Sequence, residues 1–256
     1  MNFISLVGVE LKKIRRSKIS LILLIPVIIM WIPSIINSGI NFDTRDVRIS
    51  PENNFFIQGF MGMVWFMIPA ILGICTVLLT QTERSNKGIL KMLSLPVNTA
   101  QLCLAKFTVL LLMALTQMVM TIAAYYISAA IASYIHNYNF LLKPVYVCRT
   151  TLSIYAGEIP MAAIFWMMAN LITAPVFSIG LGLASIVPSV LIINTKIWFL
   201  YPMSYPFYLL MVEYGKAAEG MYETHIDWLP WFPVAFSITI VALVIACIRF
   251  GAAERR

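Results

Sequence analysis

Few residues in this sequence have the types and spacing that chemistry needs. Glu223, His225 and Asp227 alternate near one another and could bind a cation, because carboxylates and imidazoles are ordinary metal ligands. The alternative interpretation is a loop of solvated side chains. The other histidine, His136, belongs to no H-E-x-x-H motif, and the sequence has no G-x-x-x-x-G-K-[ST] loop to hold a nucleotide. We therefore predict no catalytic residues and no metal site.

The elements that carry these residues must lie in lipid. Of the 256 residues, 61% are hydrophobic and only 11% are charged, and the mean hydropathy is +0.87. A soluble domain has roughly 25% charged residues, so the composition excludes a cytosolic or secreted globular protein. The net charge of +7 would suggest nucleic acid in a soluble protein. In a membrane protein the positions of the positive charges indicate which segments face the cytoplasm. We therefore expect no nucleic acid partner.

The hydropathy pattern predicts a single domain, residues 1–256, that is an all-α integral membrane protein with six transmembrane helices. The predicted spans lie near residues 18–38, 59–82, 106–134, 157–173, 175–194 and 230–249. The fourth and fifth spans form one apolar block of about 54 Å as a single helix, too long for a bilayer core of about 30 Å. We expect the chain to turn back between Asn170 and Pro175, because proline disfavours helix at the residue before it.

Sorting the charges by side predicts the orientation. If both termini are cytoplasmic, the inner segments hold twelve Lys and Arg residues against three acidic residues, and the outer segments hold six against eight. The inner side then carries +9 and the outer side −2, in agreement with the positive-inside rule. We therefore predict a multi-pass protein of a bacterial plasma membrane with the N and C termini in the cytoplasm.

Residues 1–17 show an amphipathic pattern that is typical of a helix at the membrane interface. The apolar residues at helical spacing are Phe3, Leu6, Val7, Leu11 and Ile14. Basic residues lie mostly elsewhere around the helix and would face anionic headgroups. The alternative is an ordinary positively charged flank of the first span.

Ionisable residues are absent from the predicted span interiors, which argues against a proton-coupled carrier. Glu158 is the nearest exception. It precedes Pro160 at the predicted start of the fourth span, where it either favours the helix N-terminus or contacts a substrate. The predicted fifth span has small residues four apart, which indicate either a helix interface or a flexible segment: Ser178, Gly180, Gly182 and Ala184.

Residues 83–99, between the second and third predicted spans, are the most informative segment. Apolar and basic residues alternate there with helical spacing, and Pro96 ends the pattern. A short amphipathic helix of this kind fits a groove on a partner protein. We predict that the following residues couple the chain to that partner: Glu83, Arg84, Lys87, Gly88, Leu90, Lys91, Leu93 and Pro96.

With these features the chain resembles the permease subunits of type 2 ABC transporters, in particular the small permeases of lantibiotic immunity and resistance transporters. The resemblance rests on four degenerate motifs that together cover nearly the whole chain: E-L-K-K-I-R-R-S at 10–17, E-x-x-x-x-G-x-x-K-x-L-x-x-P at 83–96, Lys106, and the aromatic-proline stretch at 198–208. It implies six spans and a coupling helix at 83–99 that seats in a separate ATPase. ATP and magnesium would then be bound by that partner and no cofactor by this chain.

The outer segment 195–229 is rich in aromatic residues, which prefer the membrane interface, and in acidic residues. The resemblance implies that part of it re-enters the outer leaflet. The segment either offers a surface to a cationic amphipathic peptide or is an aromatic anchor with solvated charges. The candidate substrate residues are Trp198, Tyr201, Tyr205, Glu213, Glu223 and Asp227.

The resulting hypothesis is a transport subunit, not an enzyme, that serves in ATP-driven expulsion of a lantibiotic-type antimicrobial peptide. Its expected partners are two ABC ATPase subunits, a second permease that is identical or paralogous, membrane lipid and the peptide. One alternative is a type 2 ABC exporter of another cargo, such as bacitracin, a drug or a lipid-linked compound. An alternative of another class is an immunity or scaffold protein that acts without ATP.

Overall fold

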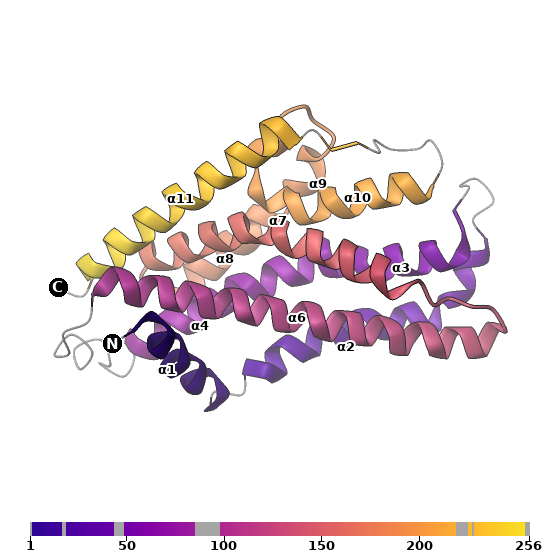
Figure 1. The fold of residues 1–256 in the computed structure, drawn as a ribbon, viewed down its shortest axis with the longest axis horizontal. Coiled ribbons are helices and arrows are strands. Elements are labelled where there is room, and N and C mark those ends of the chain that lie inside the picture. The colour runs from indigo at the N-terminus through magenta and orange to yellow at the C-terminus, as the bar shows by residue number, and fades with distance from the viewer. Residues whose placement is uncertain are drawn as a thin grey trace.

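The computed structural model describes residues 2–16, 19–43, 49–84, 98–218, 225–226 and 228–253, and every regular element in these ranges is helical. The helices form an elongated bundle, with both termini at one end (Figure 1). We call this the terminal end, and we call the opposite end, which holds loop 137–143, the far end. The elements of the first half are α1 (Phe3–Arg16), α2 (Ile19–Ile36), η1 (Ser38–Phe42), α3 (Pro51–Gly62), the π-helical turn η2 (Met63–Met67), α4 (Ile68–Arg84) and α6 (Thr99–His136).

The second half of the chain contains two long helices separated by shorter ones. These elements are α7 (Pro144–Leu171), α8 (Pro175–Ile186), α9 (Ser189–Ile192), η3 (Trp198–Leu200), η4 (Pro202–Ser204), α10 (Tyr205–Ala217) and α11 (Trp228–Ala253). Ala174 is extended, with φ −81° and ψ 113°, between α7 and α8. The helix therefore stops just before Pro175, inside the stretch where the sequence predicts the chain to turn back.

Five helices in the described part of the chain are long and apolar enough to cross a membrane: Pro51–Gln81, Thr99–His136, Pro144–Leu171, Pro175–Ile192 and Trp228–Phe250. The apolar stretch of α2, Leu21–Ile36, is shorter. These helices identify a multi-pass membrane protein. They overlap all six predicted spans, but several begin well before the hydropathy windows do.

Local capping explains these early helix starts. The Asn98 side chain accepts a hydrogen bond from the Ala100 amide at 3.0 Å, so α6 begins seven residues before the predicted span at 106. Pro144 occupies the first turn of α7, thirteen residues before the predicted start at 157. Asn137, in the left-handed region at φ 50°, ends α6. Hydropathy locates apolar segments, whereas caps decide where a helix begins and ends.

Helix α6, which reaches the far end, is longer than a bilayer core is thick. The 38 residues of α6 are about 57 Å long, against about 30 Å of hydrocarbon. An aromatic cluster packs α2, α3 and α6 together there, with Trp31 edge-on to Phe60 at 5.6 Å between ring centroids. Within this cluster the Tyr125 hydroxyl donates to the Phe140 carbonyl at 3.1 Å. Aromatic packing thus forms the far-end part of the hydrophobic core that runs through the bundle.

Candidate functional site

The predicted coupling segment joins two helices at the terminal end. Glu83 and Arg84 are the last residues of α4, and Thr99 begins α6 (Figure 1). The other six predicted coupling residues lie outside the described residues: Lys87, Gly88, Leu90, Lys91, Leu93 and Pro96. The described structure therefore places the two flanks of this segment, and both flanks are at the end that also holds α1.

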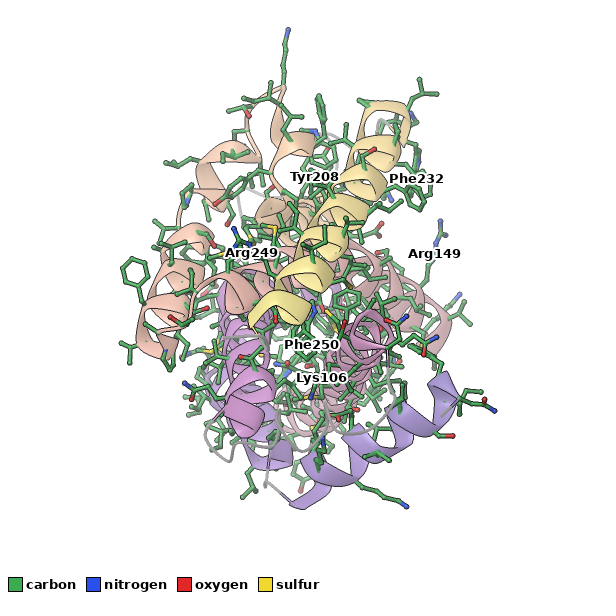
Figure 2. The ribbon with its side chains drawn as sticks, turned by 90° about the vertical axis from the view of Figure 1, so that its left-hand side faces the viewer. Lys106, Arg149, Tyr208, Phe232, Arg249 and Phe250 are labelled. Carbon is green, nitrogen blue, oxygen red and sulfur yellow. The ribbon has the colours of Figure 1, made fainter. Side chains whose placement is uncertain are left out.

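A buried ion pair attaches α1 to α6 at this end. The Lys106 ammonium donates to Glu10 Oε2 at 2.7 Å, and the side chains of Lys106 and Glu10 are only 1% and 3% exposed. Lys13, one turn along α1, donates to Glu10 Oε1 at 2.6 Å. In Figure 2 the molecule is viewed onto its terminal end, and Lys106 lies among the helices. The pair fixes an amphipathic helix beside the start of α6.

The charge state of Glu10 follows from this environment. Burial raises the pKa of the Glu10 carboxyl, but the Lys106 ammonium and then Lys13 lower it by more in total, so that the pKa is below its ordinary value of 4.5. Glu10 is therefore ionised at neutral pH. Sequence reasoning noticed both residues only as parts of separate motifs and missed the contact, because 96 positions separate them.

Glu158 lies in the interior of α7 and not at a helix start. Because α7 begins at Pro144, the interpretation of Glu158 as a residue at a helix N-terminus is wrong. The side chain is buried, and no described residue hydrogen-bonds to either carboxylate oxygen. A Cβ added at the neighbouring Gly157 would lie 2.8 Å from Leu209 Cδ1, which shows how closely α10 approaches α7 at this level.

The predicted aromatic substrate residues pack against one another. The Trp198 ring stacks on Tyr208 with centroids 3.6 Å apart and planes inclined by 15°. Tyr205 is fully buried and donates to the Phe199 carbonyl, and burial raises the pKa of its phenol. Tyr201 is half-buried and donates to the Ser185 carbonyl. In this conformation these residues stabilise the turn between α9 and α10 and present little surface to a ligand.

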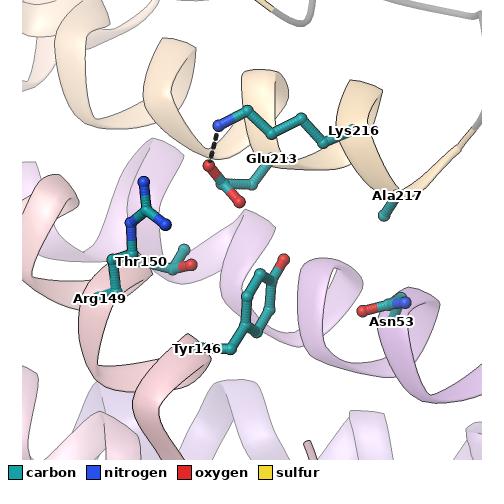
Figure 3. Close-up of a pocket in the computed structure, with 7 residues that line it drawn as sticks. All are labelled: Asn53, Tyr146, Arg149, Thr150, Glu213, Lys216 and Ala217. Carbon is teal, nitrogen blue, oxygen red and sulfur yellow. Dashed lines mark hydrogen bonds and ion pairs between the residues drawn. The ribbon is translucent and has the colours of Figure 1, made fainter. Parts of the chain in front are cut away.

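A polar pocket opens at the far end between α3, α7 and α10. Its volume is about 310 Å³ (Figure 3). The lining residues are Asn53, Tyr146, Arg149, Thr150, Glu213, Lys216 and Ala217. Lys216 donates to Glu213 Oε1 at 2.5 Å, and the two side chains are 44% and 18% exposed. In Figure 3 the Arg149 guanidinium, the Glu213 carboxylate and the Tyr146 hydroxyl all point into the space between α7 and α10.

This pocket contains only one of the predicted acidic substrate residues. Glu213 lines it, whereas Glu223 and Asp227 lie outside the described residues. His225 is described, but the predicted cation cluster around it cannot be placed. Among the described residues no group of three or more His, Cys, Asp and Glu could hold a metal ion. His136, at the far end, hydrogen-bonds through Nε2 to the Ser38 hydroxyl at 2.9 Å.

The small residues of α8 divide between two faces. Ser178 and Gly182 are buried, and a Cβ added at Gly182 would meet the Phe165 ring of α7 at 3.4 Å. Gly180 and Ala184 are exposed, and a Cβ added at Gly180 would meet nothing within 4 Å. The first pair thus contributes to helix packing within the chain, while the second faces outward.

The fold and these two sites define the class of protein. It is a multi-pass helical membrane protein with an amphipathic helix fixed at one end and an open polar pocket at the other. The family model for ABC-2 family transporter protein matches residues 6–189, and the chain belongs to this family. It is thus a membrane permease of a type 2 ABC transporter, a transport component that works with ABC ATPases. No curated protein and no solved structure matched in the comparisons.

Proposed function

We propose that the chain is the permease subunit of an ATP-driven transporter that expels a lantibiotic-type peptide from a bacterial plasma membrane. The coupling part of this proposal rests on the arrangement of the terminal end. Residues 85–97 connect α4 to α6 there, and the Glu10–Lys106 pair fixes α1 to the same helix that leaves the segment. Motion of an ATPase against residues 83–99 would thus be transmitted to α6 and α1 together.

The charge distribution supports the orientation that this mechanism needs. With the terminal end in the cytoplasm, twelve of the eighteen Lys and Arg residues lie on the inner side. Two permeases, identical or paralogous, would associate with two ATPases, which would bind ATP and magnesium. The exposed small residues Gly180 and Ala184 offer one face for contact between permeases.

A peptide cargo is supported by the resemblance of the sequence motifs to lantibiotic immunity permeases. A different cargo is favoured by one specific observation. The pocket at the far end contains two cations and one carboxylate, so it does not provide the acidic surface that a cationic peptide needs. A type 2 ABC exporter of a lipid-linked compound or a drug is therefore the second candidate function.

Purification of the tagged chain from its native membrane tests the assembly. We expect an ABC ATPase to co-purify. Gly88→Val and Pro96→Ala should uncouple ATP hydrolysis from protection of the cells and leave the assembly intact. Gly73→Ala is the control for a glycine replacement outside the segment, because a Cβ at Gly73 meets nothing within 4 Å. A chain that purifies alone and still protects cells would contradict the ATPase partnership and support the scaffold alternative.

Deletion of the gene, followed by growth on a panel of lantibiotics, tests the cargo. We expect survival to fall for at least one lantibiotic and to return with the wild-type gene. Unchanged survival on the whole panel, together with lost resistance to an unrelated drug, would favour the second candidate function.

A further inference from the structure

We propose that the far-end pocket binds the phosphate group of a lipid-like anion, with Arg149 and Lys216 as the cationic contacts. This inference does not depend on the peptide cargo. It concerns residues that the sequence-based interpretation did not select, apart from Glu213.

The charge of the pocket favours an anion. Arg149 and Lys216 provide two positive charges and Glu213 one negative charge. Glu213 already accepts from Lys216 at 2.5 Å, whereas Arg149 forms no ion pair or hydrogen bond with any residue in the described ranges. An arginine fork matches two oxygens of one phosphate. A divalent cation would need several oxygen ligands of net negative charge, which this lining lacks.

Neutral side chains complete the lining of the pocket. Tyr146 and Thr150 contribute hydroxyl groups, and Asn53 contributes a side-chain amide that also donates to the Ser50 hydroxyl at 2.9 Å. Asn53 is in the first turn of α3, which begins at Pro51. Glu52 is in the same first turn and already supplies the negative charge that a helix N-terminus favours, so the contacts to the anion are the side chains of the pocket.

The depth of Arg149 indicates a ligand anchored in the bilayer. Arg149 lies 22 residues from Leu171, the terminal-side end of α7, which corresponds to about 33 Å. This is close to the hydrocarbon thickness of about 30 Å, so the guanidinium reaches the level of the opposite headgroups. In Figure 2 Arg149 projects from the side of the bundle.

The surface on the membrane side of Arg149 is apolar. Leu152 and Ala156 follow it at positions three and seven along α7, so the three residues share one helix face. Both are exposed, Leu152 by 62%. An acyl chain lying along Leu152 and Ala156 would hold its phosphate beside Arg149 and the mouth of the pocket.

Binding of short-chain lipids to the purified full chain in uncharged detergent tests the proposal. Dihexanoyl phosphatidic acid is the anionic phosphate monoester. Dihexanoyl phosphatidylcholine has the same tails and a phosphate diester whose charge is balanced by choline, and inorganic pyrophosphate is the soluble source. Isothermal titration would measure each affinity. We expect the wild-type chain to bind phosphatidic acid more tightly than either of the other two probes.

Variants of the pocket give effects of opposite sign. Arg149→Gln should weaken phosphatidic acid binding about tenfold, because it removes a charged hydrogen-bonding fork. Glu213→Gln removes the competing carboxylate and should bind at least as tightly as the wild type. Lys143→Gln is the matched control: it removes one cation at the N-cap of the same helix, outside the pocket, and should change binding by less than about twofold.

Several outcomes would overturn the proposal. Equal losses in Arg149→Gln and Lys143→Gln would show general surface charge, and equal wild-type affinity for the two lipids would show that the pocket does not select an anionic phosphate monoester over a zwitterionic phosphate diester. Weaker binding by Glu213→Gln than by the wild type would assign the pocket to a cation. Tight binding of pyrophosphate equal to that of phosphatidic acid would support the phosphate chemistry and overturn the lipid part. Size-exclusion profiles of all variants confirm folding, and ATPase co-purification tests the proposed function separately.

Discussion

Two glutamate–lysine pairs lie at opposite ends of the molecule and have nearly the same length. Glu10 and Lys106 are 2.7 Å apart at the terminal end, and Glu213 and Lys216 are 2.5 Å apart at the far end. The first pair joins two helices and is almost fully buried, whereas the second lies within one turn of α10 with its lysine 44% exposed. Length does not distinguish them, but burial does. A buried pair fixes helices to each other, and an exposed pair leaves its charges open to a ligand.

The largest expected effect comes from breaking the buried pair. Glu10→Gln leaves the buried Lys106 ammonium without this carboxylate, which should reduce the free energy of unfolding by about 3–5 kcal/mol. Thermal unfolding and hydrogen exchange of α1 in detergent would measure the loss. The double variant Glu10→Gln with Lys106→Met should recover much of it, because no buried charge then remains. A loss of unfolding free energy below about 1 kcal/mol would show that the buried pair stabilises the protein no more than an exposed pair does.

A second prediction concerns how side-chain packing stabilises the far end. A Cβ added at Gly59 of α3 would lie 2.5 Å from Cζ3 of the Trp31 ring, which is 2% exposed and cannot move freely. Gly59→Ala should therefore destabilise the protein by about 1–3 kcal/mol. Gly73→Ala, with open space around the new Cβ, is the control and should not destabilise. Equal melting temperatures of the two variants would contradict tight packing of α2 on α3.

The third prediction is a pH dependence at the terminal end. The pKa of Glu10 is below 4.5 when α1 is bound to α6 and returns toward 4.5 when α1 is released. The stabilisation is therefore fully present above pH 4.5 and is lost as the pH falls through the lower pKa of the bound state. Hydrogen exchange of α1 should accelerate in that acidic range in the wild type. In Glu10→Gln the hydrogen exchange of α1 should depend less on pH. The same pH dependence as in the wild type would show that other groups cause it.

The smallest expected effect belongs to the exposed pair. Glu213→Gln should change the free energy of unfolding by less than about 1 kcal/mol, because water solvates Lys216 when its partner is removed. Chemical or thermal unfolding would measure this change. The same variant should bind the anion at least as tightly as the wild type, so the pair should be needed neither for stability nor for binding. A destabilisation as large as that of Glu10→Gln would show that the pair has a structural role.

The sequence predicted the helical membrane class and the interruption near Pro175, because both depend on local composition and on the backbone of one residue. It could not predict the environment of Glu158. The start of α7 at Pro144 moved this residue from an expected helix end to a helix interior. Hydropathy windows do not detect amphipathic turns beyond the bilayer, and the first turns of α7 are of that kind.

The sequence by itself determined that the chain lies in lipid, which sides its charges favour and which segment is suited to a partner. Each of these properties depends on the composition of consecutive residues in the chain. Only the tertiary structure decided that Glu10 pairs with Lys106 across 96 positions, and that Arg149 lines the same pocket as the Glu213–Lys216 pair. The physical reason is that burial and contact depend on how helices pack, so the strength of a charge pair is set by elements that are distant in the chain.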